Sequence, residues 1–482
     1  MMRFFLMIAL ILSACSSVPR LDVGPVPVPT TAWLSAVDWP AAASETTAVL
    51  AGYLRTDTTN PPGRETAGAL YLAELLKREG IASELLEFAP GRHSLLARLP
   101  GRGDAKPLCL VSHIDVVTAE AAKWPADRQP LSGVIADGAL WGRGALDMKG
   151  MGALEVMTMI WLKRLQVPLR RDVVLLAVGD EEVDNLGMKD VISRHWARIG
   201  CSQSINEGGL GVRDAVFPGQ TFYAVSVAEK GLLWLKMTAH GPSGHGSTPI
   251  PGRAPERLLR AIDKLAQRDV PTEVHPSLRI SLAQTGWHGG GLTGWVLRHP
   301  ALWSMLVVPK LLANPASKAA LTNTVHVTGF AGGFAPNVVP SEVSATLDCR
   351  LLPGIKPRVF LEELQRIVDD PQVSFAILHE AEAAESPTED PFYQAIVRHA
   401  QGSSPAAVAG PVLSVGFTDS LFLRQVGVHA YGLVPFAVPQ ALAATMHGEQ
   451  ERIPVAEIGV GLKILLGAVL DVSAQDAAIG GR

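Results

Sequence analysis

The chain has 482 residues, of which 48% are hydrophobic and 18% are charged. This apolar fraction supports a large folded core and excludes an intrinsically disordered chain and a charged coiled coil. With 42 Lys and Arg against 46 Asp and Glu, the formal net charge is −4, so no basic surface is expected that would bind nucleic acid.

The N-terminus has the pattern of a secretion signal. Residues 4–12 are an unbroken apolar run, too short to span a membrane but typical of the hydrophobic part of a signal peptide. The following Leu12-Ser13-Ala14-Cys15 resembles a bacterial lipobox, although an ordinary secretory signal is the alternative. We therefore predict a signal peptide at residues 1–14 and lipidation of Cys15. Ser16, in place of Asp, favours by resemblance the outer membrane of a bacterial cell envelope, with the protein facing the periplasm.

Residues 16–30 (SSVPRLDVGPVPVPT) are spaced by prolines and predict an extended tether, which we place within residues 15–43. Three further cysteines, Cys109, Cys201 and Cys349, form an odd set without a CxxC pair. We expect buried thiols, and the alternative is one disulfide in an oxidising periplasm.

Strands and helices alternate in the next part of the chain. Amphipathic patterns predict helices over Glu65–Gly80 and Met148–Leu165. Apolar runs typical of strands lie at His93–Leu99, Leu108–Val111 and Val173–Val178. This alternation predicts an α/β fold with a mostly parallel sheet and helices on both faces.

From about Phe222 the pattern changes to that of a smaller α+β unit. Strand-like and helical runs follow one another in the order β-α-β-β-α-β, which is typical of a ferredoxin-like domain. The runs are Leu232–Ala239, Pro255–Gln267, Thr324–Phe330, Val343–Arg350, Arg358–Val368 and Val373–Leu378. Helical and short apolar runs return after Ser386. We therefore predict a catalytic domain made of residues 44–221 and 384–482, with an inserted lid domain at residues 222–383.

Carboxylates and histidines follow the apolar runs at five places. In open α/β sheets, ligands bind outside the carboxyl ends of the strands. The residues at these places are His113, Asp115, Asp147, Glu181, Glu182, Glu207 and His447. Buried carboxylates need cations to neutralise them. Such a set suits two Zn²⁺ ions about 3.5–4 Å apart, bridged by a carboxylate and a water.

The motifs around these residues resemble those of the aminoacylase / carboxypeptidase S / carboxypeptidase G superfamily of co-catalytic zinc hydrolases. The resemblance covers about residues 45–470 and rests on SHIDVV, WGRGALDMKG, GDEEV, INEGG, GPSGHGSTP, APNVVPSE, DCRLLPG, GFTDS and HGEQERIP. The long lid and the MHGEQERI segment are most similar to the carboxypeptidase S and N-fatty-acyl-amino-acid hydrolase branch. The resemblance implies an enzyme with two Zn²⁺ ions per chain, for which Co²⁺ or Mn²⁺ could substitute.

The resemblance also implies the metal ligands. His113 and Glu182 would bind one zinc ion, and Glu207 and His447 the other. Asp147 would bridge the two ions. The sequence leaves open which ion takes Glu182 and which takes Glu207.

Three more residues receive catalytic roles from the resemblance. The Asp115 carboxylate would orient the His113 imidazole. Glu181 would be the general base that activates the bridging water. His245 in the lid would stabilise the oxyanion, which in this family often happens across a homodimer formed through the lid.

The resemblance places the substrate's free α-carboxylate against Asn337, Arg350, Gly416 and Thr418. An Arg offers a two-pronged hydrogen-bond donor for a carboxylate, although an ion pair within the lid is the alternative for Arg350. The Trp-rich insertion Trp287–Leu312 is expected to be a helix pair that packs on the core. Its alternatives are a wall for an acyl chain or a surface that rests on a bilayer.

The sequence therefore predicts a metallopeptidase or amidohydrolase. Its substrate would be a dipeptide, a short peptide or an N-acyl amino acid with a free α-carboxylate. The alternative is a catalytically silent lipoprotein that captures peptides. The complete ligand set and the base favour the enzyme, and no GxSxG or P-loop motif points to another chemistry.

Overall fold

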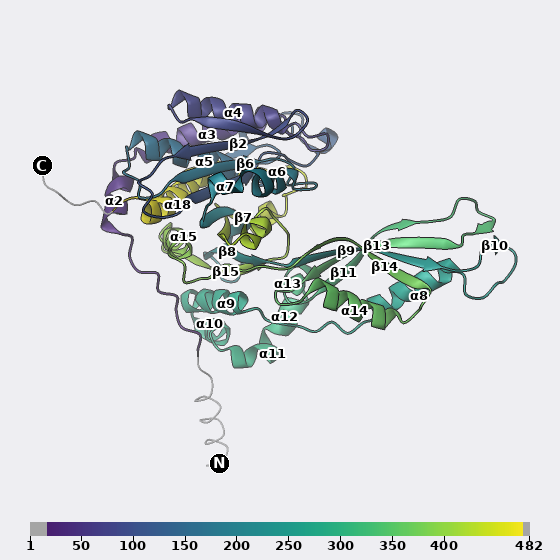
Figure 1. Cartoon of the computed structure of the whole chain (residues 1–482). Coiled ribbons are helices and arrows are strands. Elements are labelled where there is room, and N and C mark those ends of the chain that lie inside the picture. Colours follow the sequence, from purple (N-terminus) through teal and green to yellow (C-terminus); the bar gives the residue numbers. More distant parts are fainter. Residues whose placement is uncertain (1–16, 476–482) are drawn as a thin grey trace, which may run out of the picture.

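The computed structural model describes residues 17–475 (Figure 1). The predicted signal peptide and Cys15 lie outside the described residues and remain predictions. Between residues 17 and 475, no helix combines the length and the apolar character that crossing a membrane requires.

An eight-stranded sheet forms the larger part of the molecule, with the strand order β1-β2-β6-β3-β7-β16-β8-β15. The strands are β1 Ser83–Ala89, β2 Arg92–Leu99, β3 Leu108–His113, β6 Val173–Val178, β7 Gln203–Arg213, β8 Thr221–Glu229, β15 Ala407–Ser414 and β16 His429–Pro439. The neighbours β6, β3, β7 and β16 run parallel, with Leu110 opposite Leu175 and Ile205. The predicted α/β fold with a mostly parallel sheet is confirmed.

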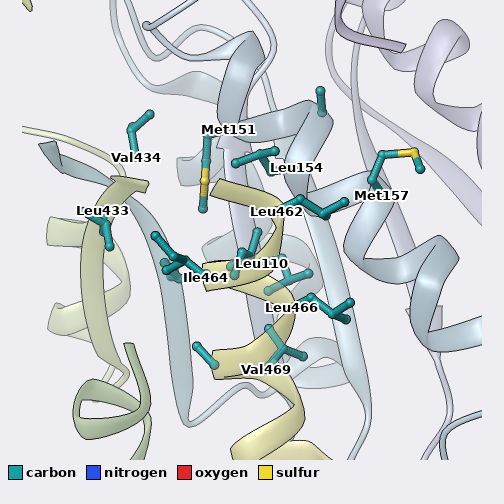
Figure 2. Packing of buried hydrophobic residues seen from close by; sticks show 14 of the residues in the cluster. Leu110, Met151, Leu154, Met157, Leu433, Val434, Leu462, Ile464, Leu466 and Val469 are labelled. Atoms are coloured by element: carbon teal, nitrogen blue, oxygen red, sulfur yellow. The ribbon is translucent and has the colours of Figure 1, made fainter. Parts of the chain in front are cut away.

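Helices cover both faces of this sheet. One face carries α3 Trp39–Arg55, α4 Glu65–Arg78, α5 Lys149–Arg164, α15 Pro391–Gln401 and α18 Val455–Ser473, and the other carries α6 Leu186–Asp190, α7 Trp196–Ile199 and α16 Ser420–Gln425. Side chains of β3 alternate between the two apolar cores, because successive residues of a strand point to opposite faces. Figure 2 shows Leu462 and Leu466 of α18 beside Leu110 of β3 and Leu154 of α5.

Cys109 and Cys201 are joined by a disulfide, with their Cα atoms 5.9 Å apart. The expectation of buried thiols is therefore wrong for these two residues and right for Cys349, which is buried and free. The bond joins β3 to the start of β7, where the parallel pairing of the two strands brings the backbones together. The sequence spacing of 92 residues gave no sign of this contact.

The proline-rich segment is extended but does not hang free. Leu21 and Val23 pack against the main core, and the Arg398 guanidinium donates a 2.6 Å hydrogen bond to the Val23 carbonyl. A short helix, α2 Val28–Ser35, follows, because a proline at its start fixes a helical φ. Among the described residues, the predicted tether is thus extended before Val28 but packed on the core, and it is helical from Val28, where an extended conformation was expected up to residue 30.

A second sheet of four antiparallel strands has the order β11-β13-β9-β14. Its elements are β9 Gly231–His240, α8 Ala254–Ala266, β11 Thr324–Ala331, β13 Glu342–Leu351, α14 Pro357–Val368 and β14 Val373–Ala381, in the β-α-β-β-α-β order read from the sequence. A two-stranded ribbon of β10 Gly244–His245 and β12 Val338–Val339 lies at its far tip (Figure 1). The strand β8, which begins next to the predicted boundary at residue 222, pairs within the first sheet and not here.

A group of short helices interrupts the second sheet between α8 and β11. They are α9 Pro276–Gly289, α10 Gly291–Leu297, α11 Trp303–Leu306, α12 Val308–Leu312 and α13 Pro315–Ala319. The helix α9 packs on the edge strand β15, where the Ser281 hydroxyl donates to the Pro411 carbonyl at 2.5 Å. Leu297, Trp303 and Val307 form a small core of their own. This insertion packs on the catalytic sheet, beneath it in Figure 1.

Candidate active site

Six acidic and histidine side chains meet at one edge of the first sheet. They come from segments far apart in the sequence, and most of them lie at or near the end of a strand or the start of a helix. They are His113 at the end of β3, Asp147 before α5, Glu181 and Glu182 after β6, Glu207 in β7, and His447 before the strand β17 Arg452–Pro454. The parallel pairing of β6, β3 and β7 brings three of these segments to the same edge.

The carboxylate of Asp147 lies between the two histidines. Its Oδ1 is 3.1 Å from His113 Nε2, and its Oδ2 is 3.0 Å from His447 Nε2. Each oxygen therefore faces a different imidazole. A carboxylate placed in this way can bridge two cations.

The distances of the remaining ligand candidates favour one of the two groupings that the sequence leaves open. Glu182 Oε2 lies 3.0 Å from His447 Nε2, and Glu207 Oε1 lies 3.6 Å from His113 Nε2. The shortest distances thus pair Glu182 with His447 and Glu207 with His113. The reason is topological, because Glu207 lies in β7, which is the direct neighbour of the strand that ends at His113. Sequence order alone does not contain this adjacency.

The electrostatic environment of this cluster favours protons or metal cations bound to its side chains. Desolvation lowers the pKa of His113, but hydrogen bonding to Asp147 and the charge of Glu207 raise it well above its usual value. Hydrogen bonds to Asp147 and Glu182 raise the pKa of His447 to about 10. Desolvation raises the pKa of Glu207, and the charge of Asp147 raises it further. Cations would relieve this repulsion among the carboxylates.

Glu181 lies beside the cluster. One of its carboxylate oxygens falls in a group with ligand atoms of His113 and Glu207 that all lie within 4.8 Å of one another. Desolvation raises the pKa of Glu181 well above its usual value, and the charge of Glu207 adds to the rise. A carboxyl group with a raised pKa can both accept and return a proton near neutral pH.

The role of Asp115 differs from the expected one. The His113 Nδ1 atom lies 2.9 Å from the Asp115 backbone carbonyl, whereas the nearer carboxylate oxygen is 3.8 Å away. The carboxylate instead accepts hydrogen bonds from the backbone N–H groups of Glu181 and Glu182, both at 3.2 Å. Asp115 therefore orients His113 through its backbone and holds the two glutamates through its side chain.

Two positioning residues were missed by the sequence analysis. The buried amide of Asn60 donates to Asp115 at 2.9 Å and to Asp180 at 3.0 Å. The buried carboxylate of Glu451 accepts hydrogen bonds from the backbone N–H groups of Leu146 and Asp147 at 2.6 and 3.0 Å. Glu451 belongs to the HGEQERIP segment, so its motif was available, but nothing in the sequence distinguished it from its exposed neighbour Glu449.

A cavity of about 770 Å³ opens beside the cluster. Asp147, Glu181, Glu182, Glu207 and His447 form part of its lining. The rest of its wall is mostly apolar and comprises Leu146, Leu210, Val212, Ala224, Ala316, Ala320, Leu413, Val415, Phe417, Val434, Ala443 and Met446. Gly416 and Thr418, two of the predicted substrate-binding residues, also line it.

The other predicted substrate residues lie away from this cavity. His245 is exposed in β10, at the tip of the second sheet, and it pairs with Val338 next to Asn337 (Figure 1). Arg350 in β13 forms a two-pronged ion pair with Asp348, at 2.8 and 3.1 Å. Within one chain, the structure therefore brings the predicted ligands, base and loop together and leaves His245, Asn337 and Arg350 outside.

Comparison with known proteins fits this geometry. Residues 109–471 match peptidase family M20/M25/M40, which is three quarters of the chain. The chain belongs to this peptidase family. Family membership makes it a metallohydrolase that cleaves amide bonds, and the match spans every residue of the metal cluster.

Individual family members are similar over most of their length. The human N-fatty-acyl-amino acid synthase/hydrolase is 27% identical over 370 residues, which cover 75% of this chain and 73% of that protein. Aminoacylase-1B of Rattus norvegicus is 25% identical over 440 residues, which cover 89% of this chain and 95% of that protein. The alternative of a silent lipoprotein receives no support from these relatives.

Solved structures of the family share the fold. Human carnosine dipeptidase 1 superposes with a TM-score of 0.67 at 15% identity, covering 93% of this chain and 99% of that one. A metallo-carboxypeptidase of Sulfolobus solfataricus gives a TM-score of 0.67 at 20% identity, covering 89% and 99%. Enzymes of the family use divalent metal ions, and this chain has the donors for them. Glu182 Oε1 is buried without a hydrogen-bond partner among residues 17–475, as expected of an atom that a cation would contact.

Proposed function

We propose that this protein is a dizinc amidohydrolase whose substrates are N-acyl amino acids with an apolar acyl group. The observation that carries this proposal is the cavity, whose lining combines the carboxylate–histidine cluster with a wall of mostly apolar side chains. A dipeptide with polar side chains would leave most of that wall in contact with water. An acyl chain would cover the wall, and each CH₂ group that it buries would stabilise the complex by about 0.8 kcal/mol.

The composition of the wall supports an acyl chain over a charged side chain. Among the residues that line the cavity, none is Lys or Arg, and the acidic residues are all members of the carboxylate–histidine cluster. Ala316 and Ala320, from α13 and the residue that follows it, contribute small side chains to the wall. The name of the human relative, an N-fatty-acyl-amino acid synthase/hydrolase, fits the same substrate class.

The distances within the cluster support one assignment of the metal ligands. Glu207 and His113 would hold one Zn²⁺, Glu182 and His447 would hold the other, and Asp147 would bridge them. When bound, the two ions polarise the scissile carbonyl and lower the pKa of a shared water. Co²⁺ or Mn²⁺ could take their place, because oxygen and imidazole donors accept all three ions.

Glu181 moves the proton in this proposal. Its carboxylate lies at the cluster without being held by an imidazole, and it accepts the proton of the attacking water. It then delivers that proton to the amine that leaves the tetrahedral intermediate. The backbone hydrogen bonds to Asp115 keep the peptide between Glu181 and Glu182 fixed while the proton moves.

The amino-acid end of the substrate would be held by the loop at Gly416 and Thr418. Thr418 is itself fixed by a hydrogen bond from its hydroxyl to the buried Glu229 carboxylate. We propose that Arg350 and Asn337 grip the α-carboxylate and that His245 stabilises the oxyanion. All three lie outside the cavity in the single chain, so this step requires closure of the lid or a second copy of the chain.

A substrate panel tests the proposed acyl specificity. The zinc-loaded protein is incubated with N-acyl amino acids of increasing acyl length and with dipeptides of matched amino acids. We expect kcat/KM to rise from acetyl to a medium-length acyl chain by at least tenfold, since two added CH₂ groups contribute about 1.6 kcal/mol. Faster cleavage of polar dipeptides than of any acyl amino acid would contradict the proposal.

A variant of the wall sharpens this test. Ala320→Phe would fill the cavity and should lower kcat/KM for long acyl chains while N-acetyl substrates are still cleaved. The matched control is Ala313→Phe, which adds the same side chain to an exposed position of the same insertion outside the cavity. Equal effects of the two variants on the long-chain substrates would show that this wall does not bind the acyl group.

A further inference from the structure

The helical insertion has an unusual charge composition. Residues 276–320 contain the basic residues Arg279, Arg298, Lys310 and Lys318 and no Asp or Glu, in a chain whose net charge is −4. The same segment contains three of the ten tryptophans of the chain. Basic and aromatic residues beside apolar ones are typical of segments that lie at a membrane surface.

The outer helices of the insertion expose large apolar side chains. Leu292 at the start of α10 is 78% exposed, and Met305 of α11 is 69% exposed. Trp287 and Leu306 are also exposed. We call these four residues the docking face. Figure 1 shows α10 and α11 on the side of α9 that points away from the catalytic sheet, so this face is directed outward.

The N-terminal segment is fastened to this same insertion. The Val18 N–H donates to the Arg298 carbonyl, and the Trp287 indole donates to the Val18 carbonyl, both at 3.0 Å. The buried side chain of Gln284 accepts from the Leu21 N–H at 2.8 Å and donates to the Pro19 carbonyl at 3.0 Å. These four bonds fix the place from which the chain leads back to its apolar N-terminal residues.

We propose that the docking face rests on a lipid bilayer that contains anionic lipid. Only two residues lie between Cys15 and Val18. The attachment point of a lipid on Cys15 would therefore lie within about 11 Å of the Val18 backbone. If the leader were retained, its apolar run at residues 4–12 would also reach the bilayer close to this face. In either case the predicted N-terminal anchor would hold the docking face close to the membrane.

The basic residues of the insertion and the position of its attachment point both fit a lipid bilayer as the partner of the docking face. Arg298 lies over the Trp287 ring, 4.3 Å from its centroid, so a cation and an aromatic ring are presented together next to the attachment point. The inner end of the insertion carries Ala316 and Ala320, which line the catalytic cavity. The same insertion thus carries the docking face on α9, α10 and α11 and contributes to the cavity wall at α13.

The experiment uses the full chain purified from membranes and reconstituted in vesicles. A fluorescent NBD label is placed on a cysteine introduced by Leu292→Cys or Met305→Cys. The matched control is Leu259→Cys, at a 64% exposed leucine of α8. The wild-type chain, labelled in parallel, gives the background, because Cys349 is buried and Cys109 and Cys201 are disulfide-bonded.

We expect the labels at positions 292 and 305 to shift to shorter emission wavelengths in vesicles containing phosphatidylglycerol. Lipids carrying a doxyl group should quench them at least twofold, and the label at position 259 should not respond. Equal emission in purely zwitterionic vesicles would contradict the contribution of the basic residues. Water-like emission at both positions, or a protein that does not float with the vesicles, would overturn the proposal. This readout needs no catalysis, so it is independent of the proposed function.

Discussion

The carboxylate of Glu451 accepts a hydrogen bond from the backbone N–H of Asp147, the residue that lies between the two histidines. The same carboxylate receives the N–H groups of Gly144 and Leu146 and an ion pair from Arg143. It is buried, and each of its oxygens has two donors. Glu451, which lies in the C-terminal part of the chain, therefore fixes the loop that carries Asp147.

This contact predicts that Glu451→Gln weakens metal binding without touching a ligand. The amide NH₂ would face N–H donors in place of an acceptor, so the Asp147 loop would shift. Loss of a residue that orients a metal ligand typically costs ~10–100-fold in metal affinity. Competition with a chelator measures the affinity. Glu449→Gln, in the same segment but exposed, is the control and should bind metal as the wild type does. Unchanged affinity in Glu451→Gln would contradict the positioning role.

Substitution of Glu181 and substitution of Glu182 are predicted to have different effects on the enzyme. Glu182 lies 3.0 Å from His447, so Glu182→Gln replaces an anionic donor by a neutral one and should lose zinc. Glu181→Gln keeps the shape and both metals but removes the proton acceptor, so kcat should fall by the ~10²–10⁴ typical of general-base loss. Metal content and kcat are measured on the two variants side by side. Loss of zinc in Glu181→Gln, with Glu182→Gln fully loaded, would reverse the two roles.

The fold could be predicted because its signals are local. The apolar run at Val173–Val178 and the amphipathic pattern at Glu65–Gly80 each specify an element within a few residues, and β6 and α4 lie there. The candidate ligand residues could be named because they lie in short motifs, such as SHIDVV and GDEEV, that resemble those of the family, and their binding of metal stays a prediction. Their grouping could not be predicted, because Glu207 meets His113 only through the pairing of β7 with β3. The same holds for Cys109 with Cys201 and for Val18 on the insertion.

Metal binding is predicted to release protons at neutral pH. The pKa of His447 is raised to about 10 in the metal-free chain, so its imidazole is protonated at pH 7 and must lose that proton to bind a metal. The apparent metal affinity should therefore rise as the pH increases from 7 toward 10. Calorimetry of Zn²⁺ binding at pH 7, in two buffers with different ionisation enthalpies, counts the protons. We expect at least one proton for each chain loaded, and none would contradict the prediction.

His245 is predicted to act on the transition state and not on metal binding. It is exposed in a two-stranded ribbon far from the metal cluster, so its loss should leave the metal content unchanged. If a second copy or lid closure brings it to the oxyanion, His245→Ala should lower kcat by ~10²–10³ with KM nearly constant. A normal kcat would assign His245 to the structure of the ribbon. Mixing His245→Ala with Glu181→Gln then tests the two-copy arrangement, because mixed dimers would recover activity at one of their two sites.

Cys15 is predicted to attach the protein to the membrane. It follows a small-residue pair after the apolar run, where the lipobox pattern couples cleavage to lipidation. Cys15→Ser should therefore release the protein from the membrane fraction or leave an uncleaved precursor, which migrates as a larger species. Metabolic labelling with a radioactive fatty acid should mark the wild-type chain and not the variant. Cys349→Ser is the control, because Cys349 is buried in the second sheet and should leave both labelling and fractionation unchanged. Labelling that persists in Cys15→Ser would contradict the lipid attachment at this residue.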